Sequence, residues 1–477
     1  MSTPLPAPVA GASFRLADFV WRACAAYGEW LRRHAAVVRA LQWVVVAAYV
    51  LLVTVPAFLP LPPDNARALD NVTVFAQWAF WGAWWPLVIV SMFVAGRTWC
   101  GVLCPEGTLT EAASRFGLHR ATPRWLRWAG WPFVAFALTT VFGQLVSVYQ
   151  YPKAVLLVLG GSTIAAIAVG LVFGREKRVW CRYLCPVNGV FSVLARMAPV
   201  HFRVDRARWD ANAGHISIHP VNCAPMVRIK RMTGGSDCHM CGRCSGHLDA
   251  VRLAPRRANA EVTALSPHDA SMWDALLIVV GLVGLAIGAF QWSASPWFVQ
   301  MKLAAAGFVV DHGPAWLLAD DAPWWLLTNY PENNDVFTWL DGALIVIYIA
   351  LVTLVLSVST FGLLGLAARL LPGTARAQTW RLSYALIPLA GLGVFLGLSS
   401  LTVALAKSEG IGLAFVPAAR AIVLALGASW SAWLAWRMLA SARSHSRRIA
   451  AFAACCLANA IIVAAWTLLF FVWGAGK

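Results

Sequence analysis

Long apolar runs dominate this chain and restrict what it can fold into. We identify nine of them, near 42–60, 73–95, 131–149, 154–173, 272–290, 341–368, 382–404, 413–436 and 450–473. A helix needs about 20 apolar residues to cross a bilayer, where only internal hydrogen bonds satisfy the backbone. Only 12% of the residues are charged, against about 25% in soluble proteins. The sequence therefore predicts an all-α polytopic membrane protein with about nine transmembrane helices.

The net charge of +17 is distributed unevenly between the loops. Lys and Arg concentrate in the loops 96–130, 174–271, 369–381 and 437–449. The opposite loops and the tail hold Arg67, Lys153, Lys302, Lys407 and Lys477. Because positive loops stay in the cytoplasm, we expect a multi-pass protein of the bacterial inner membrane, with a cytoplasmic N-terminus and a periplasmic C-terminus. The charge then reports topology and contact with lipid, not with nucleic acid.

Three regions follow along the chain. Residues 1–40 predict a cytoplasmic amphipathic helix on the membrane surface, with a short tail of no function as the alternative. Residues 41–271 predict a four-helix membrane region, and residues 272–477 a five-helix one. The external loop 291–340 is rich in Trp, which favours the membrane boundary. Its acidic residues leave a hard-metal site as an alternative.

Two cysteine motifs repeat at the cytoplasmic ends of the second and fourth predicted spans. Both follow the pattern R-x-W-C-x-x-L-C-P, first with Cys100 and Cys104 and then with Cys181 and Cys185. Repeated membrane hairpins predict a pseudo-symmetric pair. We therefore expect four thiols at one depth.

A third motif, Cys238-His-Met-Cys241-Gly-Arg-Cys244, lies in the loop 174–271. Its spacing is that of the first three ligands in a bacterial ferredoxin run, which predicts a cytoplasmic ferredoxin-like iron–sulfur region. Leu248 stands where the fourth ferredoxin cysteine is expected. Either Cys223, upstream in the same loop, or a Cys-Pro cysteine of the hairpins completes the set. Eight cysteines are enough for two [4Fe–4S] clusters, so all eight are candidate cofactor and metal ligands.

Other chemistries fit these cysteines less well. A zinc site would add His215, His219, His239 or His247 to a C-x2-C pair. Thiol redox chemistry favours C-x-x-C over the longer gap of the hairpin motifs. Buried structural cysteines are the third alternative, and Cys24, Cys455 and Cys456 are most simply apolar helix residues. Arginines flank the motifs, where they would raise a cluster's reduction potential or merely mark topology.

The two W-C-x3-C-P motifs, followed by a ferredoxin-like loop, resemble the membrane polyferredoxins. This family includes NapH-type quinol dehydrogenases, NosR-type proteins and CcoG-type proteins. The resemblance covers roughly residues 41–255 and implies redox roles for Cys100, Cys104, Cys181, Cys185, Cys238, Cys241 and Cys244. The single incomplete ferredoxin run and the membrane C-terminal half are most similar to the ferredoxin (FtrD-like) subunit of FTR-type ferrous-iron uptake systems. An iron permease, a cupredoxin and a periplasmic iron-binding protein are then the implied partners.

We therefore expect a redox carrier rather than a stand-alone enzyme. It would relay electrons between a membrane or periplasmic donor and a cytoplasmic acceptor, with Fe(II) oxidation during iron uptake as one source. The alternatives are quinol-dependent donation to a periplasmic reductase, which makes quinone a candidate partner, and metal-handling assembly or redox sensing. The predicted spans contain no His, so we expect no haem b, and the external loops show no motif for covalent FMN. Arg420, inside a predicted span, is a functional candidate unless it snorkels outward.

Overall fold

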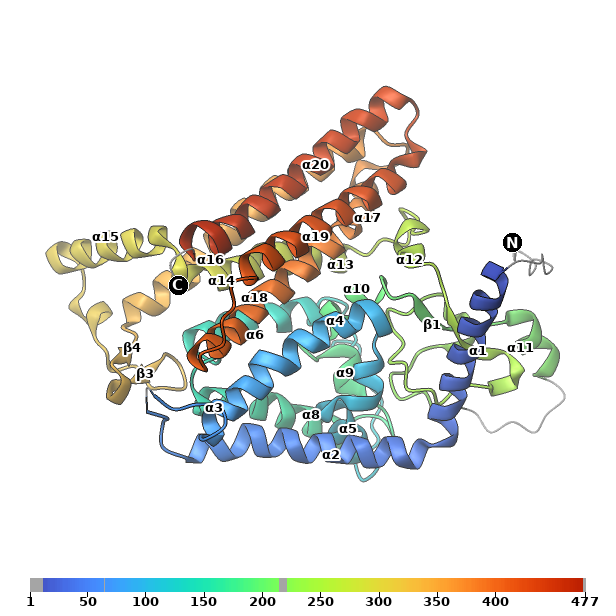
Figure 1. Cartoon of the computed structure of the whole chain (residues 1–477), viewed down its shortest axis with the longest axis horizontal. Coiled ribbons are helices and arrows are strands. Elements are labelled where there is room, and N and C mark those ends of the chain that lie inside the picture. The colour runs from blue at the N-terminus through green and yellow to red at the C-terminus, as the bar shows by residue number, and fades with distance from the viewer. Residues whose placement is uncertain (1–11, 64, 214–220, 475–477) are drawn as a thin grey trace.

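The computed structural model describes residues 12–63, 65–213 and 221–474, and it is largely helical (Figure 1). Within those ranges, eight helices are long and apolar enough to cross a membrane. They are Ala35–Phe58, Val72–Ala95, Pro152–Val172, Met272–Ala294, Trp339–Arg369, Ala375–Ser408, Val416–Ser441 and His445–Trp473. The predicted all-α polytopic fold is confirmed.

The expected span over 131–149 forms a shorter helix, α6 (Trp131–Leu145). At ~1.5 Å per residue its 15 residues reach about 22 Å, less than the roughly 30 Å of a hydrocarbon core. The chain turns back after α6, where the Val148 amide donates to the Gly143 carbonyl at 2.9 Å. The Thr328 amide, from the loop 291–340, donates to the Leu145 carbonyl at 2.8 Å. Another part of the protein therefore supplies a hydrogen bond to a carbonyl group at the end of the helix, which lipid would leave unpaired.

Most spans combine shorter helical segments. Their α-helical parts are α2 (Ala35–Thr54), α3 (Val72–Gln77), α4 (Trp85–Ala95), α7 (Pro152–Val155), α8 (Gly161–Val172), α13 (Met272–Leu276), α14 (Ala286–Gln291), α16 (Trp339–Arg369), α17 (Ala375–Ser383), α18 (Ile387–Ser408), α19 (Val416–Met438) and α20 (His445–Thr467). Three spans change to π-helix midway, at Trp78–Trp84, Leu156–Gly160 and Leu277–Leu285. A π-helical turn holds an extra residue and often marks a functional region.

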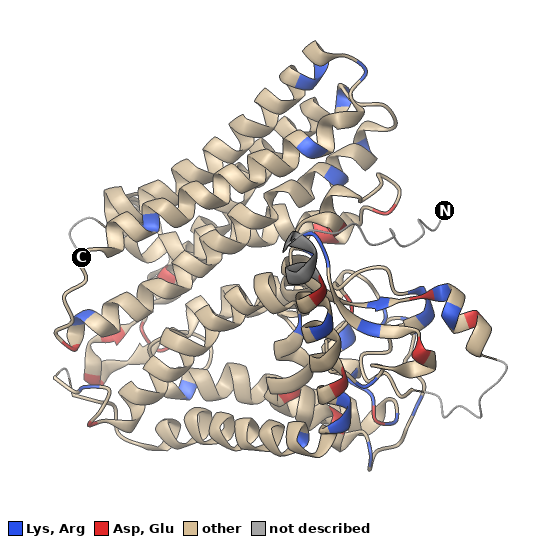
Figure 2. Cartoon of the chain, turned by 45° about the vertical axis from the view of Figure 1, so that its right-hand side comes forward, with Lys and Arg blue, Asp and Glu red and all other residues tan. Residues whose placement is uncertain are grey.

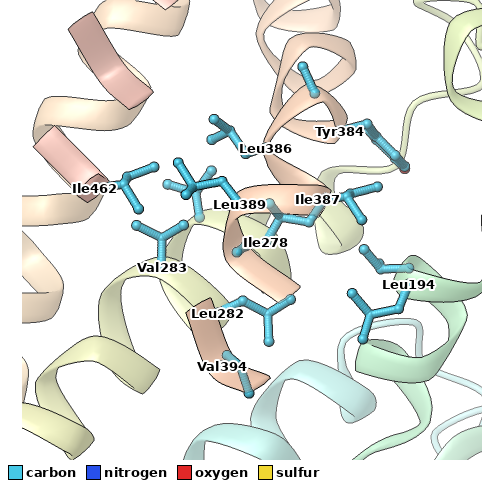
Figure 3. Close-up of a cluster of buried hydrophobic side chains, with 14 of the residues drawn as sticks. Leu194, Ile278, Leu282, Val283, Tyr384, Leu386, Ile387, Leu389, Val394 and Ile462 are labelled. Carbon is cyan, nitrogen blue, oxygen red and sulfur yellow. The ribbon is translucent and has the colours of Figure 1, made fainter. Parts of the chain in front are cut away.

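The two membrane regions share one hydrophobic core, drawn in Figure 3. Leu194, from α10 (Asn188–Ala195) in the first region, lies in this core. Ile278 and Leu282 of the fourth long span join it, as do Ile387 of α18 and Ile462 of α20. Because these side chains are buried against one another, the C-terminal spans form one body with the cysteine-bearing hairpins.

A small non-membrane region follows the second hairpin. Its antiparallel strands, β1 (Val200–Val204) and β2 (Val251–Pro255), pair in a two-stranded sheet. Two short helices, α11 (Arg206–Asn212) and α12 (Ala260–Thr263), flank the strands in sequence. The sheet brackets the loop that carries the third cysteine motif, and its side chains pack with Met240.

The expected N-terminal helix forms as α1 (Ala12–Arg33), but its inner face packs on protein. Gly28 fits against Leu253 of β2, and Leu31 lies against Gly242 of the third cysteine motif. Phe19 and Trp30 remain exposed on α1. The helix therefore covers the ferredoxin-like loop, and contact of its outer face with lipid stays a prediction.

Charged residues separate along the molecule (Figure 2). Lys and Arg gather near α1, α11 and the β1–β2 sheet, and at the neighbouring ends of the C-terminal spans. The loop 291–340 lies away from them and forms α15 (Pro296–His312) and a hairpin of β3 (Asn329–Tyr330) and β4 (Asp335–Val336). The positive loops predicted from sequence thus meet at one end of the fold. Arg420 of α19 is half-buried, donates to the Ser400 hydroxyl at 3.2 Å and lies over the Phe470 ring.

Packing inside the C-terminal region gives a stability prediction. A Cβ at Gly393 would lie 2.3 Å from Nε1 of the buried Trp466. Gly393→Ala should therefore overpack the core and lower the unfolding free energy by about 1–3 kcal/mol. Thermal unfolding in detergent measures this, with Gly362→Ala as the control because a Cβ there meets nothing within 4 Å. Equal unfolding temperatures for the two variants would contradict the packing.

Candidate iron–sulfur site

The two hairpin motifs adopt closely similar backbone geometry. In the first, the Cys104 amide donates to the Trp99 carbonyl at 2.9 Å; in the second, the Cys185 amide donates to the Trp180 carbonyl at 3.0 Å. Each bond joins the same two positions of the repeated sequence, which are five residues apart. Cys104 then caps α5 (Pro105–Ala113), and its sulfur accepts a hydrogen bond from the Gly107 amide at 3.4 Å. The pseudo-symmetry predicted from the repeat thus extends to the local fold.

The four hairpin thiols, Cys100, Cys104, Cys181 and Cys185, form one group that we call the hairpin quartet. Burial and the nearby Cys100 thiol raise the pKa of the Cys104 thiol to about 12. Burial and then Cys104 raise the pKa of Cys181, and both Cys181 and Cys104 contribute to raising that of Cys185. These mutual effects require the four thiols to lie close together.

The loop thiols form a second group, the loop quartet of Cys223, Cys238, Cys241 and Cys244. Burial, followed by Cys238, Cys241 and Cys223, raises the pKa of the Cys244 thiol. Burial and then Cys241 raise that of Cys238 to about 12, and Cys223 adds to the effect. The sequence left open whether Cys223 or a hairpin cysteine completes the C-x2-C-x2-C set. In the structure, Cys223 lies near the three cysteines of that set. Cys104 and Cys185 lie instead with the other hairpin thiols.

The remaining cysteines are placed as apolar residues. Cys24 of α1 is partly buried beside the β1–β2 sheet, and Cys455 is buried within α20. In the described part of the chain, no cysteine forms a disulfide bond.

The two quartets meet through backbone contact. Gly101 follows Cys100 directly, and a Cβ there would lie 2.0 Å from the His239 carbonyl oxygen and 2.8 Å from the Cys241 amide. Glycine is therefore needed for this close approach. The Gln42 side chain, from α2, donates to the Gly101 carbonyl at 2.9 Å and ties the junction to the membrane region.

Buried arginines surround the thiols. Arg97 and Arg178, which begin the two hairpin motifs, are 2% and 1% exposed. Arg97 donates to the Ser236 carbonyl at 3.0 Å and to the Asn188 side chain at 2.6 Å. Topology alone requires positive residues on the cytoplasmic side but not their burial. Of the two interpretations of these arginines, their burial therefore favours an electrostatic effect on a cluster's reduction potential over a role in topology alone.

The polar groups left without partners fit an iron–sulfur cofactor. Buried N–H groups of Arg97 (Nε) and Arg178 (Nη2) and both ring nitrogens of His239 have no hydrogen-bond partner. Buried donors ordinarily find acceptors, and cluster sulfurs are acceptors that tune the potential. Each quartet matches, in number and kind of side chain, the four-cysteine ligand set of a [4Fe–4S] centre.

The histidines considered for a zinc site lie in different surroundings. Within the described ranges, no three His, Cys, Asp or Glu side chains converge closely enough to hold a single metal ion. His239 is buried beside the loop quartet, and His247 packs on Trp209. His215 and His219 lie outside the described residues.

A cavity of about 790 Å³ adjoins the hairpin quartet from the membrane side. Trp81, Trp84 and Leu282, from the π-helical segments of two spans, are among its mainly apolar lining residues, and it reaches Cys104 and Cys185. Tyr149 and Gln144, which follow or end α6, line it further from the thiols. Residues from several spans build this cavity, and sequence analysis did not predict it.

Glu106 gives the cavity a polar end. Its carboxylate accepts hydrogen bonds from the Ser162 hydroxyl at 2.7 Å and the Trp180 indole at 2.9 Å. Burial raises its pKa. Sequence analysis missed this residue, although an acidic side chain directly after Cys-Pro in a basic loop was a visible signal.

Comparisons with known proteins cover the hairpin motifs. Residues 77–129 and 156–205, which contain both hairpin motifs, match the family described as a 4Fe-4S binding domain. YccM of Escherichia coli, named for electron transport, is 25% identical over 42% of this chain and 62% of its own length. MauN of Methylorubrum extorquens, a methylamine utilization ferredoxin-type protein, is 28% identical over 27% of this chain and 48% of its own. No solved structure shows a significant match.

Fold, thiols and comparisons together describe a multi-pass membrane protein that contains a region similar to a 4Fe-4S binding domain. More particularly, its relatives are named as electron transport or ferredoxin-type proteins, and the likeness is in keeping with a membrane polyferredoxin. The chain spans about half to two-thirds of the length of the relatives just named.

The contact at Gly101 generates a prediction about cofactor content. Gly101→Ala should push the loop away from the hairpins, because the added methyl group meets backbone rather than a mobile side chain. We expect a clear loss of iron and acid-labile sulfide per chain in anaerobically purified protein. Gly161→Ala, where a Cβ meets nothing within 4 Å, should keep both. Unchanged cofactor content in Gly101→Ala would show that the junction is not required.

Proposed function

We propose that this chain is a membrane-bound redox relay that carries two [4Fe–4S] clusters. The hairpin quartet would hold one cluster and the loop quartet the other. The observation that carries the proposal is the backbone contact of the two quartets at Gly101. A bound [4Fe–4S] centre supplies a one-electron redox couple. The protein's part is to bury the thiols, place the Arg97 and Arg178 donors beside them and keep the two sites adjacent.

The orientation is part of the proposal. The gathering of Lys and Arg around the cysteine-bearing end supports a cytoplasmic N-terminus and clusters on the cytoplasmic face of a bacterial inner membrane. The C-terminus and the loop 291–340 would then be periplasmic. An acceptor on the cytoplasmic side would meet the loop quartet, which lies outside the spans.

Counting clusters in variants tests the ligand set. With two cubanes the protein should hold about eight iron atoms per chain, and Cys223→Ala should hold about four. Cys24→Ala should keep the full content, because that thiol packs as an apolar side chain near the same sheet. Iron analysis and EPR of the reduced proteins measure this. Full iron content in Cys223→Ala would reject the loop quartet, and absence of iron and sulfide from the wild type would reject the relay.

The cavity favours a lipid-soluble electron donor. A roughly 30 Å hydrocarbon core is too wide for one electron-transfer step from the outer surface to the thiols. The cavity is apolar, has a hydrogen-bond acceptor at Glu106 and reaches the hairpin quartet, as an isoprenoid quinol requires. A quinol releases two electrons, which match two one-electron centres, and its two protons return to water. This supports quinol-dependent reduction of the clusters.

Ferrous-iron uptake is the other donor hypothesis that we propose for testing. It rests on the family resemblance and would join the relay to an iron permease, a cupredoxin and a periplasmic iron-binding protein. The hairpin of β3 and β4 offers oxygen ligands: Asp335 accepts a hydrogen bond from Tyr151 at 2.7 Å, and Tyr330 stacks on Tyr151. In this version Fe(II) loses one electron outside and a cluster gains it.

One experiment separates the donors. A soluble quinol should reduce the clusters of the purified wild type. Ala165→Trp, which fills the cavity, should lower the rate of this reduction about tenfold, as expected for a loss of ~1.4 kcal/mol of quinol binding. Ile164→Trp, on the exposed face of the same helix, is the matched control. If Fe(II) reduces the clusters of both variants equally and quinol reduces neither, the result would support iron oxidation instead. Clusters that neither donor reduces would favour an assembly or sensing role.

A further inference from the structure

One buried carboxylate touches all three cysteine-bearing segments. Glu111 lies on α5, the helix that begins after Cys104. Its Oε2 atom accepts a hydrogen bond from Arg178 Nε at 2.8 Å, and its Oε1 atom accepts one from Arg243 Nη2 at 2.5 Å. Arg178 precedes Cys181, and Arg243 lies between Cys241 and Cys244. The side chains of one Arg–Glu–Arg link therefore come from both hairpin motifs and from the ferredoxin-like loop.

The link is shielded from water. Glu111 is 5% exposed and Arg178 1%, whereas Arg243 reaches the surface with a third of its side chain. Arg178 also donates to the Cys100 carbonyl through Nη1. Gly107 leaves room for this guanidinium, since a Cβ there would lie 3.1 Å from Nη1. Buried charges are retained only with good partners, so each member of the link depends on the other two.

The charges of the link act on both quartets. Arg178 lies close enough to interact electrostatically with Cys181 of the hairpin quartet and Cys241 of the loop quartet. Its Nη2 group is buried with no partner in the polypeptide. Two guanidiniums and one carboxylate leave a net positive charge between two sites that would each hold an anionic cluster.

We propose that Glu111 is the positioning residue that fixes the two cluster sites relative to each other, through Arg178 on one side and Arg243 on the other. This inference rests on the proposed two-cluster relay. In the step that it serves, one electron leaves the cluster of one quartet, which is oxidised, and arrives at the other, which is reduced. No bond forms or breaks. The rate of such a step falls steeply with separation, so a fixed distance matters more here than elsewhere in the fold.

Glu111→Gln tests the inference in the full-length protein. The change keeps the shape of the side chain and removes the negative charge that holds the two arginines together. Both clusters should become easier to reduce, because positive charge near a cluster raises its potential. The magnetic interaction between the two reduced clusters, seen as splitting in EPR, should change as their spacing relaxes. Redox titration followed by EPR gives both readings.

The chain offers a closely matched control. Glu261 also joins two arginines, accepting from Arg196 at 3.3 Å and from Arg256 at 2.5 Å. Glu261→Gln should leave the potential of the hairpin-quartet cluster unchanged, because this second link touches the ferredoxin-like loop at the Gly235 amide (2.9 Å) but neither hairpin motif. Shifts of the same size in both variants would mean that any loss of a buried carboxylate has this effect, and would overturn the inference.

A second variant covers the case in which Glu111→Gln does not fold. Arg243→Gln cuts the link at its partly exposed end and should lower the potential of the loop-quartet cluster more than that of the other, again with changed splitting. Two clusters with wild-type potentials and splitting in this variant would overturn the positioning role. A wild type that lacks two clusters would instead reject the relay itself.

Discussion

Arg178 carries a full positive charge at a place where only 1% of the side chain meets solvent. Such a charge must be paired and hydrogen-bonded, or the protein loses more energy by burying it than packing returns. The Glu111 carboxylate and the Cys100 carbonyl provide the partners; Cys100 belongs to the other hairpin motif, and Glu111 to the helix α5 that follows it. The end of one hairpin can therefore reach its folded position only together with the end of the other. The hairpin quartet is a result of that mutual dependence.

On their membrane side, the hairpin motifs adjoin the apolar cavity. Three spans contain π-helix where they pass the cavity, at Trp78–Trp84, Leu156–Gly160 and Leu277–Leu285, and the short helix α6 adds a further wall. The thiols are thus closed to water by charged and backbone groups on one side, but face an apolar space on the other. A relay that exchanges electrons with lipid-soluble and soluble partners needs this asymmetry.

The spans and the turns of the hairpin motifs could be predicted from the sequence, because the relevant signals are local. Apolar length predicted the spans, and the repeated motif predicted matching turns at Cys104 and Cys185. The partner of the C-x2-C-x2-C loop remained open, since whether Cys223 or a hairpin cysteine lies near it depends on how distant segments pack. Glu111 was missed for the same reason: its role exists only once Arg178 and Arg243 arrive from elsewhere. The helix α6 is shorter than the predicted span 131–149, because the chain turns after Leu145, where the amide of Thr328, far along the chain, pairs with its end.

The helix α1 lies over the ferredoxin-like loop, with Gly28 against Leu253 and Leu31 against Gly242. The ribosome makes α1 before the segments that α1 packs on, because Gly242 and Leu253 lie just past the midpoint of the 477-residue sequence. Until those segments meet α1, the thiols of the loop have no cover. Biogenesis of this protein therefore includes a period in which iron and sulfide can be delivered to an open loop, and the N-terminal helix closes over the finished product.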